Sequence, residues 1–257
     1  MCHSTITTKF TLPWILSWQP VMRPAVCSTC WRQFVPIKRA TACASCGRAQ
    51  ERSQPCSDCQ RWPEIGAFHN EALFEYNEAM HNYFQRYKFQ GDYQLRQVFA
   101  SSMQAAVGQR HAEAYVVVPV TPTTMQTRGF NQVTGWLAVA PMPGLVTQAT
   151  AKSVPQSKKD RQARLKTPQP FRLAPNAIVA GKHLLLVDDI YTTGATMRHA
   201  AALLLENGAK SVTGLTLARQ FQGKVAFGLF IIALSIIMKL SKVIKEWSFN
   251  YFGYTAM

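Results

Sequence analysis

Acidic residues are scarce in this chain. Its 257 residues include 13 Asp and Glu against 28 Lys and Arg, which gives a formal net charge of +15. A positive excess of this size favours polyanionic partners, namely nucleic acid, phosphorylated ligands or an acidic membrane surface. Over residues 128–172, eight basic residues accompany one acid, Asp160, a pattern typical of a phosphate-binding segment or of a solvated basic loop. Charge alone does not choose among these partners.

Several familiar catalytic motifs are also absent. The sequence contains no GxxxxGK[ST] loop, no HExxH helix and no GxSxG turn. These absences exclude P-loop nucleotide hydrolases, HExxH metallopeptidases and GxSxG hydrolases as templates. The histidines at 69, 81, 111 and 199 stand singly, which favours surface or capping roles over metal binding.

A secretory signal and a run long enough to span a membrane are missing as well. The first 20 residues have no basic start, and Pro13 interrupts their short apolar patch. The largely apolar run at 225–238 has 14 residues, whereas a spanning helix needs about 20. We therefore expect a cytoplasmic protein without a stable membrane span. The run itself suits either an interfacial helix or an extension unrelated to the fold.

Composition divides the chain into three parts. Residues 1–66 hold all seven cysteines and lack long periodic runs, as expected of a small module held by metal instead of a core. Residues 67–219 carry alternating strand and helix signals, and residues 220–257 form an atypical apolar and basic tail. The length is sufficient for one α/β core and a smaller module.

The middle part predicts a parallel sheet with crossover helices. Its strand-like runs are apolar at nearly every position, which is typical of strands buried on both faces of a parallel sheet. Its helix-like stretches show apolar residues at helical spacing and end near glycines. The predicted strands are residues 72–77, 114–120, 181–189 and 211–218, and the predicted helices are residues 77–89, 93–108 and 196–208.

Six cysteines form three CxxC pairs, which indicate metal binding more than disulfides in a chain without a secretory signal. The pairs are Cys27 and Cys30, Cys43 and Cys46, and Cys56 and Cys59. Two such pairs make a closed, structural Zn²⁺ site, so three pairs leave one unmatched. If pairs combine in order along the chain, the second and third complete a site. The first pair then lacks partners or recruits Cys2.

Basic and aromatic residues accompany the cysteines. Interleaved side chains of these two kinds suit single-stranded nucleic acid, because bases stack on the rings and phosphates pair with the cations. A solvated ribbon surface with a few packing aromatics explains the same pattern. The residues concerned are Trp31, Arg32, Phe34, Lys38, Arg39, Arg48, Arg52, Arg61 and Trp62.

The stretch LLVDDIYTTGAT at 185–196 places two acids at the end of a predicted buried strand and a Thr-rich turn after them. Asp188 and Asp189 suit ribose hydroxyls and a nearby Mg²⁺, whereas they would repel a phosphate. The turn suits the phosphate instead, because it supplies backbone N–H groups and hydroxyls at a helix start. A plain strand-to-helix turn with Thr caps is the structural alternative. The turn residues are Thr192, Thr193, Gly194, Ala195 and Thr196.

These residues resemble the phosphoribosyl-pyrophosphate (PRPP) loop of type I phosphoribosyltransferases. Together with RGFNQ at 128–132, YKFQGDY at 87–93, QSKKDRQAR at 156–164 and the cysteine-rich front, residues 21–219 resemble the ComF family. That family includes the bacterial competence proteins called ComFC and relatives called GntX. The resemblance implies an α/β fold with a type I phosphoribosyltransferase-like parallel sheet flanked by helices, and a small N-terminal zinc-ribbon module. Because ComF-like proteins often carry four CxxC pairs, it also implies that Cys2 is the remnant of a lost first pair, which indicates a start site placed too late or a truncated chain.

The resemblance also implies roles for particular residues. Asp188 and Asp189 would face the ribose of PRPP with Mg²⁺ bound nearby, and the Thr192–Thr196 turn would hold its 5′-phosphate. A pyrophosphate-side loop would follow the 114–120 strand, where Thr121, Arg128 and Gly129 stand. We expect Arg128 to neutralise a leaving diphosphate.

Three functions remain open from the sequence. The first is a ComF-type protein that handles single-stranded DNA during natural transformation, with competence-machinery partners such as a helicase-like protein. The second is an active phosphoribosyltransferase that transfers the ribosyl group of PRPP to an unknown acceptor. The third is a degenerate fold kept for protein contacts, because fold alone does not settle function.

Overall fold

The computed structural model places much of the chain, with gaps. It describes residues 2, 6, 11–17, 24–61, 68–148 and 169–220. The chain divides into two compact units after Phe221, and the expected tail at 220–257 lies outside the described residues, apart from Gln220. The QSKKDRQAR segment at 156–164 also lies outside them.

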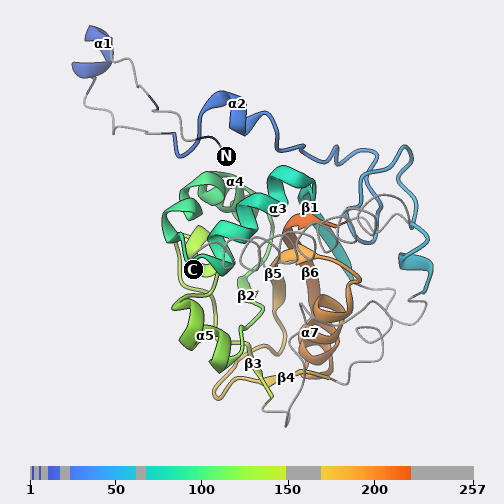
Figure 1. Ribbon diagram of the computed structural model, residues 1–257. Helices are drawn as coiled ribbons and strands as arrows, with labels where there is room; N and C mark the ends of the chain where they lie inside the picture. Colours follow the sequence, from blue (N-terminus) through green and yellow to red (C-terminus); the bar gives the residue numbers. More distant parts are fainter. Residues whose placement is uncertain are drawn as a thin grey trace, which may run out of the picture. The chain divides into compact units, whose positions relative to one another are not determined.

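Four strands form one parallel sheet in the order β1-β6-β5-β2 (Figure 1). The strands are β1 (His69–Glu75), β2 (Ala114–Val117), β5 (His183–Tyr191) and β6 (Ser211–Arg219). They confirm the expected α/β class with a parallel sheet. The strand β5 is central and runs two residues past the acids that we expected to end it, so Asp188 and Asp189 still belong to the ladder.

Helices flank the sheet, and a second small sheet pairs β3 (Leu145–Thr147) with β4 (Phe171–Leu173) in antiparallel fashion. No helix among the described residues is both long and apolar enough to cross a membrane. The helices are α1 (Leu12–Ile15), α2 (Ser28–Trp31), α3 (Glu78–Phe84), α4 (Arg96–Gly108), α5 (Pro122–Arg128) and α7 (Ala195–Glu206), with short turns η1 (Cys59–Arg61), η3 (Gln85–Phe89), η4 (Tyr93–Leu95) and η5 (Thr134–Trp136).

The helix expected over residues 77–89 is interrupted. Asn77 caps α3 by accepting a hydrogen bond from the Met80 amide at 3.0 Å, but the α-helix ends at Phe84 and continues as the π-helical turn η3. A π turn adds a residue and rotates the side chains that follow it. Tyr87, within this turn, is buried, and its hydroxyl donates to the Gln132 carbonyl at 2.9 Å.

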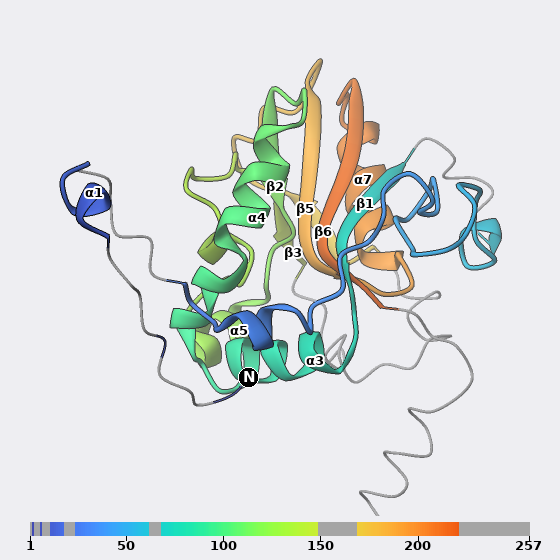
Figure 2. The same ribbon diagram turned by 90° about the horizontal axis from the view of Figure 1, so that it is seen from above.

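Each face of the sheet carries its own hydrophobic core. Along β5, Leu185 and Val187 join the cluster that contains the buried residues of α3 and α4, whereas Leu184 and Leu186 join the cluster around α7. Figure 2 shows α3 and α4 on one side of the sheet and α7 on the other. This alternation explains why the strand is apolar on both faces, as a parallel sheet between helices requires.

The cysteine-rich segment lies against the edge strand β1. The Asn70 amide donates to the Ser45 carbonyl at 2.9 Å, and the Asn70 side chain donates to the Cys46 carbonyl at 3.3 Å. A single antiparallel bridge joins Pro36 to Phe74 farther along β1. The module is therefore hydrogen-bonded to the sheet itself.

Gly47 marks the closest approach of the module to the sheet. It has a positive φ of 70°, and a Cβ added there would stand 2.5 Å from the Ala72 amide nitrogen. Gly91 has nearly the same φ of 72°, but no atom lies within 4 Å of an added Cβ. A substitution at either glycine would therefore strain the backbone to a similar degree, but only a substitution at Gly47 would also cause a steric clash.

We expect Gly47→Ala to lower the free energy of unfolding more than Gly91→Ala does. Left-handed strain costs each variant about 1–2 kcal/mol, and the clash at position 47 adds about 1–3 kcal/mol because two backbone segments must separate. Urea unfolding of both variants, with excess zinc present, measures the difference. Equal losses of stability would contradict the close docking of the module.

Candidate functional site

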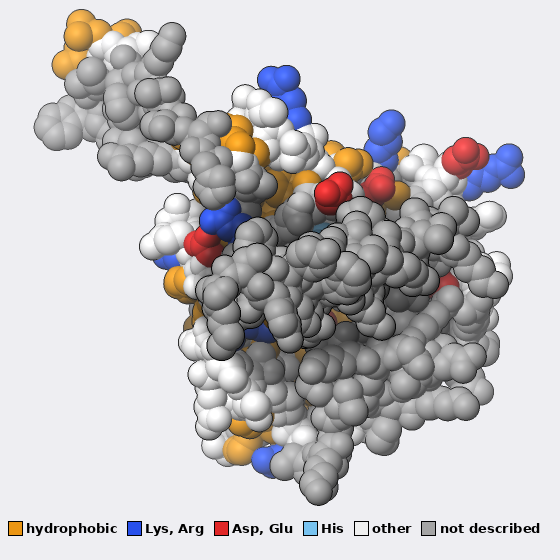
Figure 3. All heavy atoms as spheres, viewed as in Figure 1, with side chains coloured by type: hydrophobic (Ala, Val, Ile, Leu, Met, Phe, Trp, Pro, Cys, Tyr) orange, Lys and Arg blue, Asp and Glu red, His pale blue; other side chains and the backbone are white. Residues whose placement is uncertain are grey.

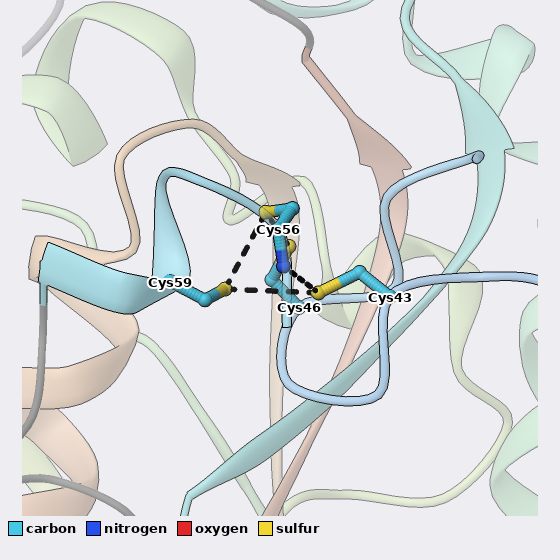
Figure 4. Close-up of side chains that lie close together, drawn as sticks. All are labelled: Cys43, Cys46, Cys56 and Cys59. Atoms are coloured by element: carbon cyan, nitrogen blue, oxygen red, sulfur yellow. Dashed lines mark hydrogen bonds between the residues drawn. The ribbon is translucent and has the colours of Figure 1, made fainter. Parts of the chain in front are cut away.

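Four cysteines converge between the module and the sheet, as shown in Figure 4. Their sulfur atoms lie within 4.8 Å of one another, and all four side chains are buried. The Cys43 to Cys59 sulfur distance is 3.8 Å, and both the Cys46 to Cys56 and the Cys56 to Cys59 distances are 3.7 Å. The second and third CxxC pairs therefore meet, as their order along the chain predicts.

These distances fit a metal and do not fit disulfides. Four sulfurs placed about 2.3 Å from a tetrahedral Zn²⁺ stand about 3.8 Å apart, whereas a disulfide bond is about 2.05 Å long. No disulfide bond joins any of the seven cysteines. The cluster can thus hold one zinc ion, with no coordination position left open for chemistry.

The thiols also oppose one another electrostatically. Hydrogen bonding with Cys46 lowers the pKa of Cys43 to about 6, while hydrogen bonding with Cys43 raises the pKa of Cys46 and of Cys59. Four thiolates cannot coexist here without a cation between them. A Zn²⁺ ion held by these sulfurs would supply that charge, and its binding would contribute directly to folding.

The first CxxC pair meets Cys2. The Cys2 sulfur lies 3.4 Å from both the Cys27 and the Cys30 sulfurs, and the Cys2 amide donates to the Cys30 sulfur at 3.1 Å. Of the two outcomes expected for this pair, the structure shows the recruitment of Cys2. The result is a group of three thiols separate from the four-cysteine cluster.

Two acids lie side by side near the carboxyl end of β5. Asp188 and Asp189 are 8% and 7% exposed, and the Asp189 amide donates to the Asp188 carboxylate at 2.8 Å. Burial raises the pKa of Asp188 well above its usual value, and the charge of Asp189 raises it further. Two neighbouring buried carboxylates need compensation, because neither burial nor repulsion favours their charged forms.

The compensation comes from a segment that the pattern of apolar residues assigned to a helix. Lys88, in η3, places its ammonium 2.5 Å from the Asp189 carboxylate, and the Gln132 side-chain amide donates to the same carboxylate oxygen. The Lys88 side chain is 12% exposed, so its ion pair with Asp189 is shielded from water. Its ammonium also stands 4.4 Å from the centre of the Phe84 ring.

Arg128 reaches the acids indirectly. Its guanidinium donates to the Gln132 side-chain oxygen and, at 3.0 Å, to the Lys88 carbonyl. Burial lowers the pKa of Arg128, and the charge of Asp189 opposes that shift. The contacts from Arg128 through Gln132 to Asp189, together with the ion pair of Lys88, make one polar network out of three separate motifs.

The turn after β5 leads directly into α7. Gly194 has a φ of 88°, and a Cβ added there would overlap the hydroxyl of Tyr191, so glycine is required. The Thr193 hydroxyl accepts a hydrogen bond from the Ala195 amide at 3.3 Å. Thr192 and Thr196 add two further hydroxyls to the same segment. Its backbone N–H groups lie at the start of a 12-residue helix, where an anion can bind.

The remaining predicted residues lie on α5, which follows β2. Thr121 caps this helix by accepting from the Thr124 amide at 3.1 Å, and Gly129 ends it in a left-handed conformation. Lys88 and Gln132 belong to the motifs at 87–93 and 128–132, but the sequence assigned no role to either residue. Their membership of these motifs was the only signal in the sequence, because their contacts with Asp189 join segments far apart in the chain.

The comparisons with known proteins agree with this geometry. Residues 141–226 match the phosphoribosyl transferase domain. Competence protein ComFC of Streptococcus pneumoniae is 37% identical over 224 residues, which cover 85% of this chain and 98% of that protein. The chain belongs to the ComF family.

Further ComF relatives extend the match. Competence protein ComFC of Bacillus subtilis is 31% identical over 205 residues, or 76% of this chain and 84% of that protein. Competence protein F of Haemophilus influenzae is 26% identical over 220 residues, or 77% of this chain and 92% of that protein. The resemblance stated from the sequence, including a zinc-ribbon-like cysteine cluster, is confirmed.

The raised pKa of Asp188 predicts a pH-dependent stability. The folded protein holds this proton more tightly than the unfolded chain does. The contribution of Asp188 to the free energy of unfolding therefore falls as pH rises from about 3.9 toward its folded pKa. We expect Asp188→Asn to gain stability relative to the wild type between pH 5 and pH 8, by up to about 1.4 kcal/mol per pH unit.

Urea unfolding at several pH values measures this relative gain. The control is Glu113→Gln, because a hydrogen bond from the His183 amide lowers the pKa of Glu113 and this carboxylate stays charged over the same range. The difference between the control and the wild type should stay flat. A flat difference for Asp188→Asn as well would contradict the assignment.

Proposed function

We propose that this protein is a ComF-type competence protein of the cytoplasm that handles single-stranded DNA during natural transformation and binds PRPP with Mg²⁺. The observation that carries the PRPP site is the buried acid pair on β5, with the Gly194 turn and the start of α7 directly after it. Relatives named for competence support the DNA role. Competence-machinery proteins, including a helicase-like protein, are the expected partners.

Each part of this site suits one part of PRPP. Asp188 and Asp189 accept hydrogen bonds from the ribose hydroxyls, and the N–H groups of the Thr192–Thr196 turn bind the 5′-phosphate. Carboxylate and hydroxyl oxygens are ligands that Mg²⁺ prefers, and the ion supplies charge neutralisation for the diphosphate. Arg128 and Lys88 are the nearby cations that attract the polyanion and offset its charge beside the acids.

We assign structural Zn²⁺ to the four-cysteine cluster and a second metal to Cys27 and Cys30 together with Cys2. The first assignment rests on the sulfur distances and the burial of all four thiols. The second rests on the three sulfurs that gather at 3.4 Å contacts. The first ion holds the ribbon against β1 and the second would hold the earlier chain segment.

The PRPP site is tested by calorimetric titration of PRPP with Mg²⁺. We expect the wild type to bind and the variant Asp188→Asn with Asp189→Asn to lose binding, because the hydroxyl acceptors are weakened. The control is Asp92→Asn, an acid that pairs with Arg86 at 2.6 Å outside the pocket, and it should bind as the wild type does. A wild type that shows no heat of binding would overturn the PRPP assignment.

Aromatic side chains offer a place for DNA bases near the acid pair. Phe89 is 61% exposed and Tyr93 is 41% exposed. The Arg96 guanidinium stands 4.2 Å from the Tyr93 ring centre, and the Phe130 ring lies 4.8 Å from it. A basic group stacked beside exposed rings is the combination that single-stranded nucleic acid uses.

The aromatics of the cysteine module are less suited to stacking than the sequence suggested. Phe34 is buried, and it packs against Phe99 at 4.9 Å between ring centres. Trp31 packs against the same two rings. On the face drawn in Figure 3, the visible Lys and Arg side chains stand singly among hydrophobic and acidic ones instead of forming one patch. Trp31 is 39% exposed, close to the 41% of Tyr93, so we prefer the Tyr93 ring because the Arg96 guanidinium stacks on it.

We expect Tyr93→Ala and Arg96→Ala to weaken single-stranded DNA binding in different ways. Loss of the Tyr93 ring lowers affinity about five-fold or more at every salt concentration, since one stacked base is worth about 1–3 kcal/mol. Loss of Arg96 instead reduces the slope of log affinity against log salt by about 0.7.

Fluorescence anisotropy with a labelled oligonucleotide, over a series of salt concentrations, separates the two effects. The matched control is Ile178→Ala, an exposed apolar residue before β5 that is 71% exposed, and it should bind as the wild type does. Unchanged binding by both test variants would move the DNA site elsewhere.

A transferase is the second candidate, favoured by the contact chain from Arg128 through Gln132 to Asp189. In that reaction the bond from ribose C1 to the diphosphate oxygen breaks, its electrons leave with the diphosphate, and an acceptor nucleophile bonds to C1. Its signature is Mg²⁺-dependent release of pyrophosphate with an added acceptor. The variant Asp188→Asn with Asp189→Asn should lack that signal.

A further inference from the structure

Arg219 joins two places that the sequence treats separately. It is the last residue of β6 and is 3% exposed. Its Nε donates to the Cys46 sulfur at 3.3 Å, and its Nη1 donates to the Thr192 carbonyl at 2.8 Å and to the Tyr191 carbonyl at 3.3 Å. One guanidinium thus contacts both the four-cysteine cluster and the turn after β5.

Further contacts fix the orientation of this guanidinium. It forms an ion pair with Asp58 at 3.4 Å, a residue that stands between the two cysteines of the third pair. It also lies over the Tyr191 ring, 5.1 Å from the ring centre. In the ladder between β5 and β6, Tyr191 is the register partner of Arg219, so strand pairing brings the two residues together.

We propose that Arg219 is a positioning residue that couples the metal centre to the phosphate-binding turn. Arginine suits this role because its planar fork of donors can serve a sulfur on one side and carbonyls on the other. Holding the Tyr191 and Thr192 carbonyls sets the backbone direction just before Gly194, and so sets where the next N–H groups point. The phosphate role of these N–H groups rests on the proposed function.

The coupling depends on the metal. A zinc ion fixes the Cys46 sulfur and leaves the four-thiolate centre with net negative charge, which anchors the guanidinium through a charge-assisted contact. Without the ion, the cysteine segment loses its main constraint and one end of the bridge is released. Thermodynamic coupling is reciprocal, so a phosphate ligand in the turn should in return retain the metal.

Hydrogen exchange at residues 192–196 tests the bridge without any ligand. We expect removal of zinc by a chelator, in reducing buffer, to raise amide exchange in this turn about five-fold or more, with α4 unchanged. The variant Arg219→Lys keeps the charge but lacks the fork, so its turn should exchange rapidly with zinc bound and respond little to the chelator. Measured zinc content confirms that this variant retains the metal.

The matched control is Arg48→Met. Arg48 also contacts the Asp58 carboxylate, at 3.8 Å, and its replacement leaves the fork of Arg219 intact, so this variant should respond to zinc removal as the wild type does. A turn in the wild type that is indifferent to zinc removal overturns the proposal. So does a change of equal size in α4, because that result indicates general loosening.

The reciprocal arm measures zinc transfer to a colorimetric chelator with and without PRPP and Mg²⁺. We expect PRPP to slow zinc loss about five-fold or more in the wild type and to have no effect in Arg219→Lys. If PRPP does not bind in calorimetry, the proposed function fails while the exchange result still decides the bridge. If PRPP binds but leaves zinc loss unchanged, the coupling fails while the site stands.

Discussion

Two carboxylates on one buried strand repel each other and lose the solvation that would stabilise their charges, so the structure around them must compensate. Asp188 and Asp189 obtain this compensation from Lys88, from Gln132 and, through Gln132, from Arg128. The π-helical turn η3 matters because it carries Lys88 toward β5. The acid pair is therefore stabilised by a side chain about 100 residues away in the chain.

Much of the architecture could be predicted from local patterns. Uninterrupted apolar runs predict the central strands, because burial on both faces leaves no polar positions, and β5 with Leu184 to Val187 has that burial. The order of the CxxC pairs along the chain predicts the four-cysteine cluster, because the short connection between the second and third pairs keeps them close together. The three-residue strands β3 and β4 had no comparable signal, since strands so short show neither an apolar run nor alternation.

The contacts between motifs were beyond the reach of sequence patterns. The pattern of apolar residues says nothing about the role of Lys88, because its partner Asp189 belongs to another element. The sequence indicates only that Arg219 lies at the end of a strand. Its contact with Cys46 joins residues 173 positions apart, which no local pattern predicts. Such contacts follow from strand order and register, which bring β6 beside β5. A single sequence reveals the elements but does not fix which side chains meet across them.

The hydrogen bonds between the cysteine-rich segment and β1 have a consequence for solubility. As the terminal strand in the order β1-β6-β5-β2, β1 pairs with a strand on one side only, and an open strand edge invites pairing with other molecules. The Pro36 to Phe74 bridge and the hydrogen bonds of Val35 and Ile37 cover that side. Proline, which has no amide hydrogen, cannot extend the pairing outward. The cysteine-rich segment thus also covers the β1 edge of the sheet, where it blocks pairing with another strand.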